Sequence, residues 1–187
     1  MHFARLFLIA AALPLALVAA ERPLKVDHSR SYVDIDVKTT LKNFTAHLDA
    51  YDLKINVDEA GKIKNAVLLF NFSDLKTGDD ERNADMLKWL GGSGATGKFE
   101  LGILALAPDG QGQVTGKLTF HESTKLIEFP INVSRNDADY TITGDPAIDY
   151  RDWNLKVYKR DFVLKVGSEL KIHFKFVGTS AEPATHG

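Results

Sequence analysis

The sequence contains no cysteine, and this absence removes several classes of protein at once. Neither a disulfide framework nor a zinc site built on thiolates can form, and no cysteine nucleophile exists. The fold must therefore be held together by packing. The 187 residues include 23 basic and 25 acidic side chains, a formal net charge of −2. Because there is neither a basic excess nor a polybasic segment, we expect neither nucleic acid nor anionic lipid as a partner.

Catalytic motifs are missing as well. The chain has no G-x-S-x-G, no glycine-rich phosphate loop and no H-E-x-x-H. Its histidines are isolated, and His28 and His121 are expected to form hydrogen bonds in loops at strand ends. These observations predict a protein that is not an enzyme and that needs no metal or other cofactor.

The first 20 residues have the features of a secretory leader. A weakly basic start precedes the apolar run Leu6–Ala19, and Val18-Ala19-Ala20 matches the small-x-small cleavage pattern. A membrane anchor is the alternative, but the run is at the short end for crossing a bilayer and no stop-transfer signal follows it. We therefore expect residues 1–20 to be a signal peptide, and no stable membrane anchor to remain after its removal.

Most of the remaining sequence alternates between apolar and polar residues, as half-buried β-strands do. Residues 32–38 are the clearest case, with Val33, Ile35 and Val37 on one face and charged residues on the other. Similar patterns predict strands at 44–50, 53–57, 64–72, 98–106, 113–121, 125–134, 140–144 and 167–177. A slip in phase at Tyr51-Asp52 predicts a bulge or bend.

Two of these strands carry further expectations. In 98–106, the residues Phe99, Leu101 and Ile103 share the predicted inward face. In 64–72 both faces are apolar, because Val67 and Leu69 point away from the inward set. Such a strand needs something to cover its outer face, either another part of the chain or a partner.

One helix is predicted at residues 79–90. It begins with acidic residues, which suit the positive end of a helix, and it stops before Gly91-Gly92, which suits a C-terminal cap. Met86, Leu87 and Leu90 can form its inward face.

Eight or so antiparallel strands with one apolar face each can form a sandwich or a barrel. A barrel of this size is either filled by its side chains or just open enough for one small ligand. Small residues on the inward face, such as Ala46, Ala66 and Gly116, fit both alternatives.

Four segments carry a resemblance to a known family. They are Val26–Val33 (D-x-x-H-S-x-V), Leu75–Gly78 with Arg82, Asp85 and Leu87 (T-G-x-x-x-R-D-x-x-L), Val114–His121 with Thr124-Lys125 (V-x-G-x-L-T-L-H-G-V-T-K/R) and Ile148–Trp153 (I-x-R-x-D-F). Their order resembles that in the YceI family of bacterial periplasmic, lipocalin-like proteins. Glu122-Ser123 replaces the usual Gly-Val, and the Y-P-x-I-x-F strand start is absent from Gly92–Phe99, so the chain resembles a divergent member.

The resemblance implies an all-β fold, an extended antiparallel eight-stranded lipocalin-like barrel with the helix near one mouth. It assigns 21–178 to the barrel and leaves 179–187 as a flexible tail. It also implies a periplasmic protein that binds, transports or sequesters an amphiphile with an isoprenoid-like tail, for example a quinone. Whether the protein is a homodimer is left open.

The residues expected to line the cavity are apolar or small and come from the predicted inward faces. They are Val33, Ile35, Phe44, Leu48, Phe70, Phe99, Gly116, Leu118, Phe129 and Phe174. Arg82 and His121 are candidate contacts to a polar headgroup, and Arg82 could equally fix the helix to the barrel. Two alternatives remain: a protein-binding module that uses the outer face of 64–72, and an enzyme acting on a lipid headgroup through His121 or Arg82.

Overall fold

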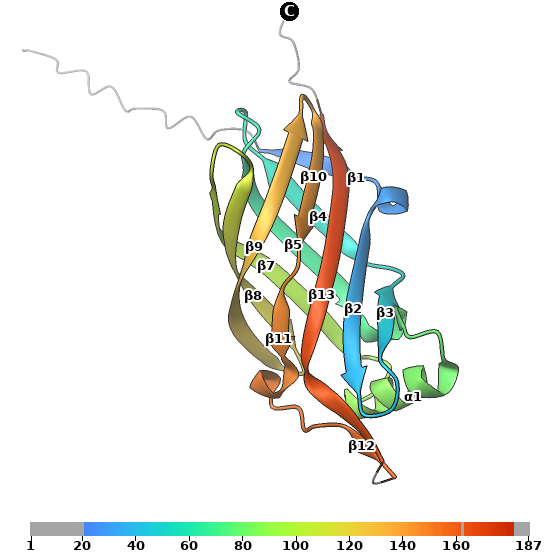
Figure 1. The fold of residues 1–187 in the computed structure, drawn as a ribbon. Coiled ribbons are helices and arrows are strands. Elements are labelled where there is room, and N and C mark those ends of the chain that lie inside the picture. Colours follow the sequence, from blue (N-terminus) through green and yellow to red (C-terminus); the bar gives the residue numbers. More distant parts are fainter. Residues whose placement is uncertain (1–20, 162, 182–187) are drawn as a thin grey trace, which may run out of the picture.

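A computed structural model describes residues 21–161 and 163–181, so the predicted signal peptide lies outside the described residues. Its strands form an antiparallel sheet that closes into a barrel (Figure 1). The ring consists of β1 (Arg22–Val26), β4 (Asp52–Val57), β5 (Ile63–Asn71), β7 (Thr96–Leu106), β8 (Gln111–Phe120), β9 (Ser123–Asn136), β10 (Asp139–Gly144) and β13 (Leu164–Ser180). β1 closes it, because Pro23 pairs with Asn56 of β4 and Leu24 with Ser180 of β13. The predicted eight-stranded barrel with one helix is confirmed.

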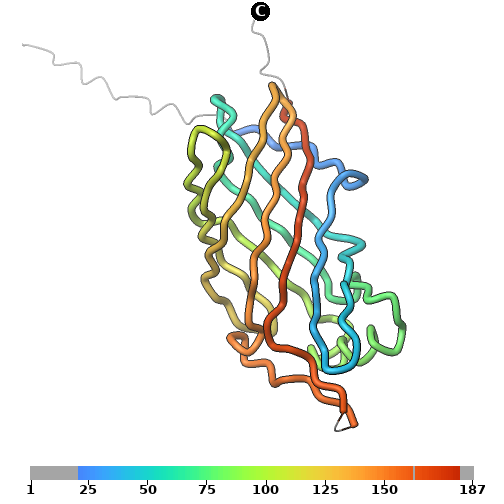
Figure 2. The backbone as a smooth tube through the Cα atoms, in the orientation of Figure 1, coloured from blue at the N-terminus to red at the C-terminus, as the bar shows by residue number. Residues whose placement is uncertain are grey.

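Shorter elements extend the ring at one end. They are β2 (Tyr32–Thr39), β3 (Phe44–Leu48), β6 (Leu75–Lys76), β11 (Ala147–Asp149), β12 (Lys159–Arg160), the helix α1 (Asp80–Trp89), and the 3₁₀ turns η1 (His28–Arg30), η2 (Phe72–Asp74) and η3 (Tyr150–Trp153). β2 pairs with β13, β3 with β2, and β6 with β3. We call the end that carries α1 and β12 the mouth end; it lies at the bottom of Figures 1 and 2.

The far end carries the β4–β5, β7–β8 and β9–β10 turns, and tightly packed side chains fill it. Tyr140 and Val57 are almost completely buried there. The Tyr140 hydroxyl donates to the Gly61 carbonyl at 2.8 Å, and the Arg135 guanidinium donates to the Ala60 carbonyl at 2.7 Å. Gly61 has a φ of +75° and leaves no room for a Cβ beside Arg135, so glycine is required at this turn.

A β-bulge corrects one expectation about β7. Leu101 pairs with Gly116 and Ile103 pairs with Thr115, so Gly102 is the extra residue on β7. An extra residue reverses the alternation of side chains beyond it. Ile103 is therefore 67% exposed instead of facing inward, and Leu104 takes the inward position.

The phase slip predicted near Tyr51 is a break between two strands. β3 ends at Leu48 and β4 begins at Asp52. Between them the Asp49 amide donates to the Asp74 carbonyl at 2.9 Å, which holds the bend against the segment after η2. The inward alternation resumes with Leu53 and Ile55 once the bend is passed.

The helix lies where the sequence predicts it, because both of its caps are local. Asp79 accepts a hydrogen bond from the Arg82 amide at 2.9 Å, as an N-cap does. At the other end Gly91 and Gly92 have φ values of +98° and +120°, and the Gly92 amide donates to the Leu87 carbonyl at 2.8 Å. Within the described residues, none of the helices has the length and apolarity needed to cross a bilayer.

The last strand is longer than predicted. β13 runs to Ser180, and Thr179 pairs with both Lys25 and Asp139. The first two residues of the predicted flexible tail are therefore strand residues. Residues 182–187 lie outside the described residues.

Candidate functional site

The barrel encloses a cavity of about 470 Å³ that reaches the surface at the mouth end. Sites for small ligands commonly measure roughly 300–1,000 Å³. Of the two alternatives, a barrel filled by side chains and a barrel open to a ligand, the structure shows the open one. The packed far end makes the cavity blind.

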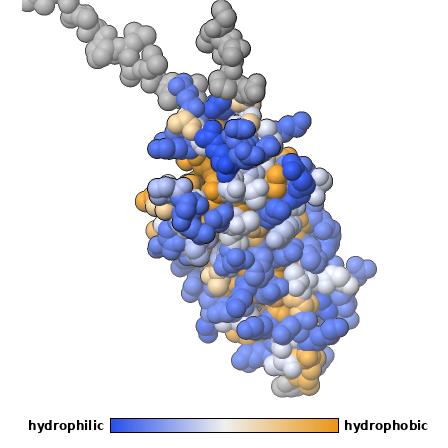
Figure 3. Space-filling model, turned by 45° about the horizontal axis from the view of Figure 1, so that its top comes forward, coloured by the Kyte–Doolittle hydropathy of each residue, from blue (hydrophilic) through white to orange (hydrophobic). Residues whose placement is uncertain are grey.

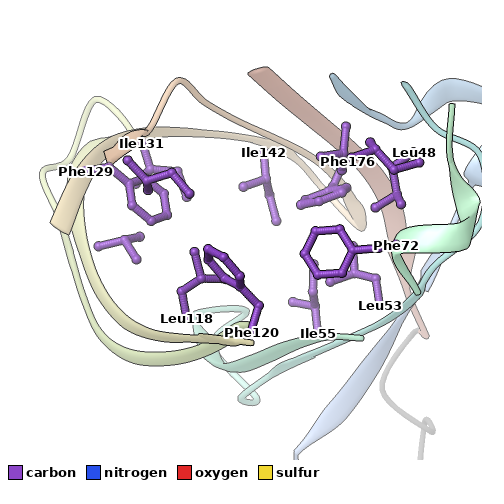
Figure 4. Close-up of a cluster of buried hydrophobic side chains, with 14 of the residues drawn as sticks. Leu48, Leu53, Ile55, Phe72, Leu118, Phe120, Phe129, Ile131, Ile142 and Phe176 are labelled. Atoms are coloured by element: carbon purple, nitrogen blue, oxygen red, sulfur yellow. The ribbon is translucent and has the colours of Figure 1, made fainter. Parts of the chain in front are cut away.

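The cavity wall is made of apolar side chains from nearly every strand. Figure 4 shows labelled members of this set, including Leu53, Ile55, Leu118 and Phe129, projecting inward from around the ring. Aromatic rings form a large part of the wall, with centroids 5–6 Å apart in pairs: Phe70–Phe72, Phe72–Phe120, Phe99–Phe129, Phe129–Phe174 and Phe174–Phe176. Edge and tilted contacts at such distances are favourable, so the wall is well packed around the empty space.

The residues predicted to line the cavity are distributed as follows. Val33, Ile35, Phe44, Leu48, Phe70, Phe99, Leu118, Phe129 and Phe174 all lie on the cavity wall. Gly116 does not, because the Phe99 ring covers it: a Cβ on Gly116 would lie 2.4 Å from that ring. Gly116 thus makes room for Phe99 rather than for a ligand.

Polar side chains on the cavity wall are concentrated at the mouth, where α1 meets the segment that follows η3. Asp85 of α1 accepts hydrogen bonds from the Tyr158 hydroxyl at 2.8 Å and from Arg160 at 3.0 Å. Arg160 also donates to Glu81 at 3.0 Å. The Trp89 indole donates to the Lys156 carbonyl at 2.9 Å. We call these contacts the latch, because they hold the helix against the loop across the opening.

The latch changes the acid–base properties of its members. Burial and the hydrogen bond to Asp85 raise the pKa of Tyr158. The negative charge of Glu81, followed by the contacts with Asp85, raises the pKa of Arg160. Tyr158 therefore stays neutral and Arg160 stays charged at ordinary pH, which preserves the latch.

Arg82 lies at the mouth and fixes the helix to the barrel. Its guanidinium carbon is 4.1 Å from the centroid of the Phe44 ring, a cation–π contact. It also donates to the Thr77 carbonyl at 3.1 Å and lies 3.7 Å from Asp79. Arg82 borders the cavity, so the position is also compatible with contact to a headgroup.

His121 does not lie on the cavity wall. It occupies the β8–β9 turn with a φ of +47°, and its Nδ1 lies 3.2 Å from the Trp153 carbonyl. This is the loop hydrogen bond expected of it. Trp153 itself is buried, stacks on Phe120 and donates to the Leu118 carbonyl at 3.0 Å.

The sequence analysis missed the part of the mouth contributed by residues 155–164. Leu155, Tyr158, Arg160 and Leu164 border the cavity, although no strand or site was predicted there. Arg160-Asp161 was interpreted as a local salt bridge, whereas its shorter contacts are with Glu81 and Asp85 of α1. The conserved-looking signal was the Arg-Asp pair, but nothing in it indicates a partner about 75 residues away.

The outer face of β5 explains its apolar pattern without a partner. Val67 and Leu69 lie between Lys54 and Asp52 of β4 and the Lys98–Glu100 pair of β7. Lys98 and Glu100 are 2.8 Å apart, and Lys54 and Asp52 are 3.5 Å apart. The aliphatic stems of such lysines cover neighbouring apolar side chains. Figure 3 shows hydrophilic residues over most of the visible face, with apolar ones between them.

Comparison with known proteins places this barrel in a family. A model of the YceI-like domain matches residues 24–178. The chain belongs to the YceI-like domain family. No curated protein matches the chain. The match covers every strand of the barrel ring except the first two residues of β1 and the last two of β13.

Solved structures of YceI-like proteins share the fold at low sequence identity. BcnA from Burkholderia cenocepacia has a TM-score of 0.69 at 21% identity and covers 83% of this chain and 100% of its own. A polyisoprenoid binding domain from Saccharophagus degradans, implicated in plant cell wall breakdown, has a TM-score of 0.65 at 18% identity, with 87% and 99% covered. The YceI protein of Campylobacter jejuni has a TM-score of 0.61 at 15% identity, with 76% and 88% covered. The barrel thus has the YceI-like polyisoprenoid-binding domain fold.

Proposed function

We propose that the protein carries or sequesters an amphiphile whose isoprenoid-like tail fills the barrel and whose polar end stays at the mouth. The observation that carries this proposal is the distribution of polarity in one cavity. Its depth is apolar and blind, and its charged residues are confined to the opening. An amphiphile with one long apolar tail has the same distribution.

Burial of the tail supplies enough free energy for binding. An isoprene unit has about five carbons, and burial of each is worth roughly 0.8 kcal/mol, so each unit gains on the order of 3–4 kcal/mol before ordering costs. Binding of this kind requires no catalytic group. Among the described residues, no cluster of three or more His, Asp or Glu side chains is arranged to hold a metal. We propose a binding protein that acts in the periplasm after export by its leader.

The decisive test fills the cavity from one wall. Ala66 of β5 faces the cavity and Val67, the next residue, faces outward. Ala66→Phe is expected to abolish uptake of a polyprenol, measured as an adduct by native mass spectrometry after export and purification. Val67→Phe adds bulk to the same strand on the other face and should leave uptake within about twofold of wild type.

Each outcome decides between carrier and non-carrier. If Ala66→Phe folds, by its circular dichroism, and still takes up the polyprenol like wild type, the ligand does not occupy this cavity. If neither the wild type nor either variant forms an adduct, the proposed function is wrong. Gly116→Leu is a poorer test, because its side chain would meet the Phe99 ring and the Glu100 carbonyl and disturb the β7–β8 pairing.

A further inference from the structure

Two turns that are far apart in the sequence form one surface at the mouth end. The β2–β3 turn and the β12–β13 turn are joined through Thr40. Its hydroxyl donates to the Val163 carbonyl at 2.6 Å, and its amide donates to the Lys165 carbonyl at 3.1 Å. The Lys165 amide in turn donates to the Thr40 hydroxyl at 3.1 Å. We call residues 38–43, 159–161 and 163–165 the mouth tip.

Apolar side chains project from both turns of the mouth tip. Leu41 is 66% exposed and Val163 is 61% exposed. Isolated exposed apolar residues are ordinary on protein surfaces. These two differ because their turns are hydrogen-bonded to each other and because Leu41 also borders the cavity. The exposed apolar surface is therefore continuous with the wall that would hold the tail.

The mouth tip is strongly basic, although the whole chain is slightly acidic. It carries Lys38, Lys42, Lys159, Arg160 and Lys165 against a single acid, Asp161, whereas the chain as a whole has a net charge of −2. Neither half of this cluster is long enough to be noticed in the sequence, because about 115 residues separate the two segments. The fold creates the basic surface that the sequence lacks.

Most of this charge is not neutralised by neighbouring acids. Arg160 is paired with Glu81 and Asp85, but the four lysines form no ion pair with any residue that the structure describes. The acidic start of α1 lies at the same end of the barrel. Its Asp79 caps the helix and its Glu81 faces Arg160, so these groups are engaged within the fold.

We propose that the mouth tip docks on an anionic lipid bilayer. Lysines near such a surface are attracted to it, each by about fivefold in binding, and apolar side chains at the tip can enter the headgroup region. Docked in this way, the mouth faces the membrane, and an amphiphile passes between bilayer and cavity without crossing water. The passage of cargo rests on the proposed function, whereas the docking itself does not.

The test measures binding to vesicles of defined composition. The protein, expressed with its leader and purified after export, is sedimented with vesicles of phosphatidylglycerol and phosphatidylcholine or of phosphatidylcholine alone. We expect tighter binding to the anionic vesicles, weakened by salt. The variant Lys38→Ala/Lys159→Ala/Lys165→Ala should bind them about a hundredfold more weakly. Val163→Asp should bind about tenfold more weakly.

Matched controls change the same chemistry elsewhere on the barrel. Lys25→Ala/Lys62→Ala/Lys64→Ala removes three exposed lysines from the part of the barrel away from the mouth, and Ile103→Asp replaces an apolar residue that is 67% exposed. Both should bind anionic vesicles within about threefold of wild type. Equal losses in the control and the mouth-tip variants, or equal binding of wild type to both vesicle types, would overturn the docking proposal.

Cargo binding is measured separately, so that the two proposals can fail independently. In detergent micelles, where no bilayer surface exists, the lysine variant of the mouth tip should bind a fluorescent polyprenol like wild type. It should extract the same polyprenol from anionic vesicles at least tenfold more slowly. Vesicle binding without any polyprenol uptake would contradict the carrier function and leave the docking intact.

Discussion

His173 lies between two carboxylates on the outer face of β13. Its Nδ1 is 2.6 Å from Asp145, and its Nε2 is 3.2 Å from Asp36. A ring nitrogen on each side can donate to an aspartate only when the imidazole is protonated. The hydrogen bond to Asp145, followed by that to Asp36, raises the pKa of His173. The Thr45 hydroxyl and then the His173 ring lower the pKa of Asp36, so the acid is charged when the histidine is.

We predict that His173→Gln removes a pH-dependent part of the stability. A raised pKa means that the folded state holds the proton more tightly than the unfolded state. The contribution of His173 is thus fully present below the unfolded pKa of about 6.5 and is lost as the pH rises through the higher folded value. Urea unfolding of wild type and variant should differ most near about pH 6 and converge toward about pH 8.5. A difference that stays constant over this range would show that the ring acts without its charge.

Single residues also show where prediction from sequence stops. The inward positions of Val33, Ile35 and Phe174 follow from an unbroken alternation, and the structure places them on the cavity wall. Ile103 was wrongly expected to face inward, because Gly102 forms a bulge that pattern alone does not reveal. Gly116 was chosen for the room it leaves, but its neighbour across the strands, Phe99, takes that room.

At the scale of elements, α1 was predictable and its docking was not. The helix has its cap residues within the segment itself, so local chemistry places its ends to within a residue. The latch joins α1 to a loop about 75 residues later in the chain, which contains only the two-residue strand β12. Nothing in the pattern of that loop indicates a contact with the helix, because the pairing depends on how the barrel brings the two together.

We predict that Asp85→Ala loosens α1 while the barrel stays folded. The change removes the acceptor for both Tyr158 and Arg160. Partly exposed pairs of this kind are worth about 1 kcal/mol or less, so global unfolding should change little. Local opening of the helix should become several-fold more frequent. Hydrogen exchange with mass spectrometry should show faster exchange in peptides covering 80–90 and unchanged exchange in peptides covering β8.

Asp80→Ala is the control for this prediction. Asp80 is an exposed acid in the first turn of the same helix, and its contribution to the helix is of the order of 0.3–1 kcal/mol. It should alter exchange in α1 less than Asp85→Ala does. If both variants exchange alike, the latch contributes no more than a general charge effect, and α1 is held by Trp89, Met86 and Leu90 instead.

On the scale of the whole molecule, the two ends of the barrel differ in what holds them. The far end is closed by buried side chains such as Tyr140 and Val57, and β1 seals the ring there by pairing with β4 and β13. The mouth end is held by the latch and by the polar contacts of the mouth tip. The empty cavity between them means that the apolar wall lacks part of the contact that a filled interior would have. A tail in the cavity would supply that contact.

The last prediction is that loading stabilises the entire barrel. A ligand that binds only the folded state stabilises it in proportion to the logarithm of its concentration over Kd. At about a hundredfold excess over Kd the gain is about 2.7 kcal/mol, which for a domain of this size raises Tm by roughly 5–10 °C. Calorimetry of wild type with and without a polyprenol should show this shift, and Val67→Phe should show it too. In Ala66→Phe, whose cavity is filled, Tm should not respond to the polyprenol. A shift of equal size in Ala66→Phe would mean that the polyprenol stabilises the protein from its surface, and the barrel interior would then not be the binding site.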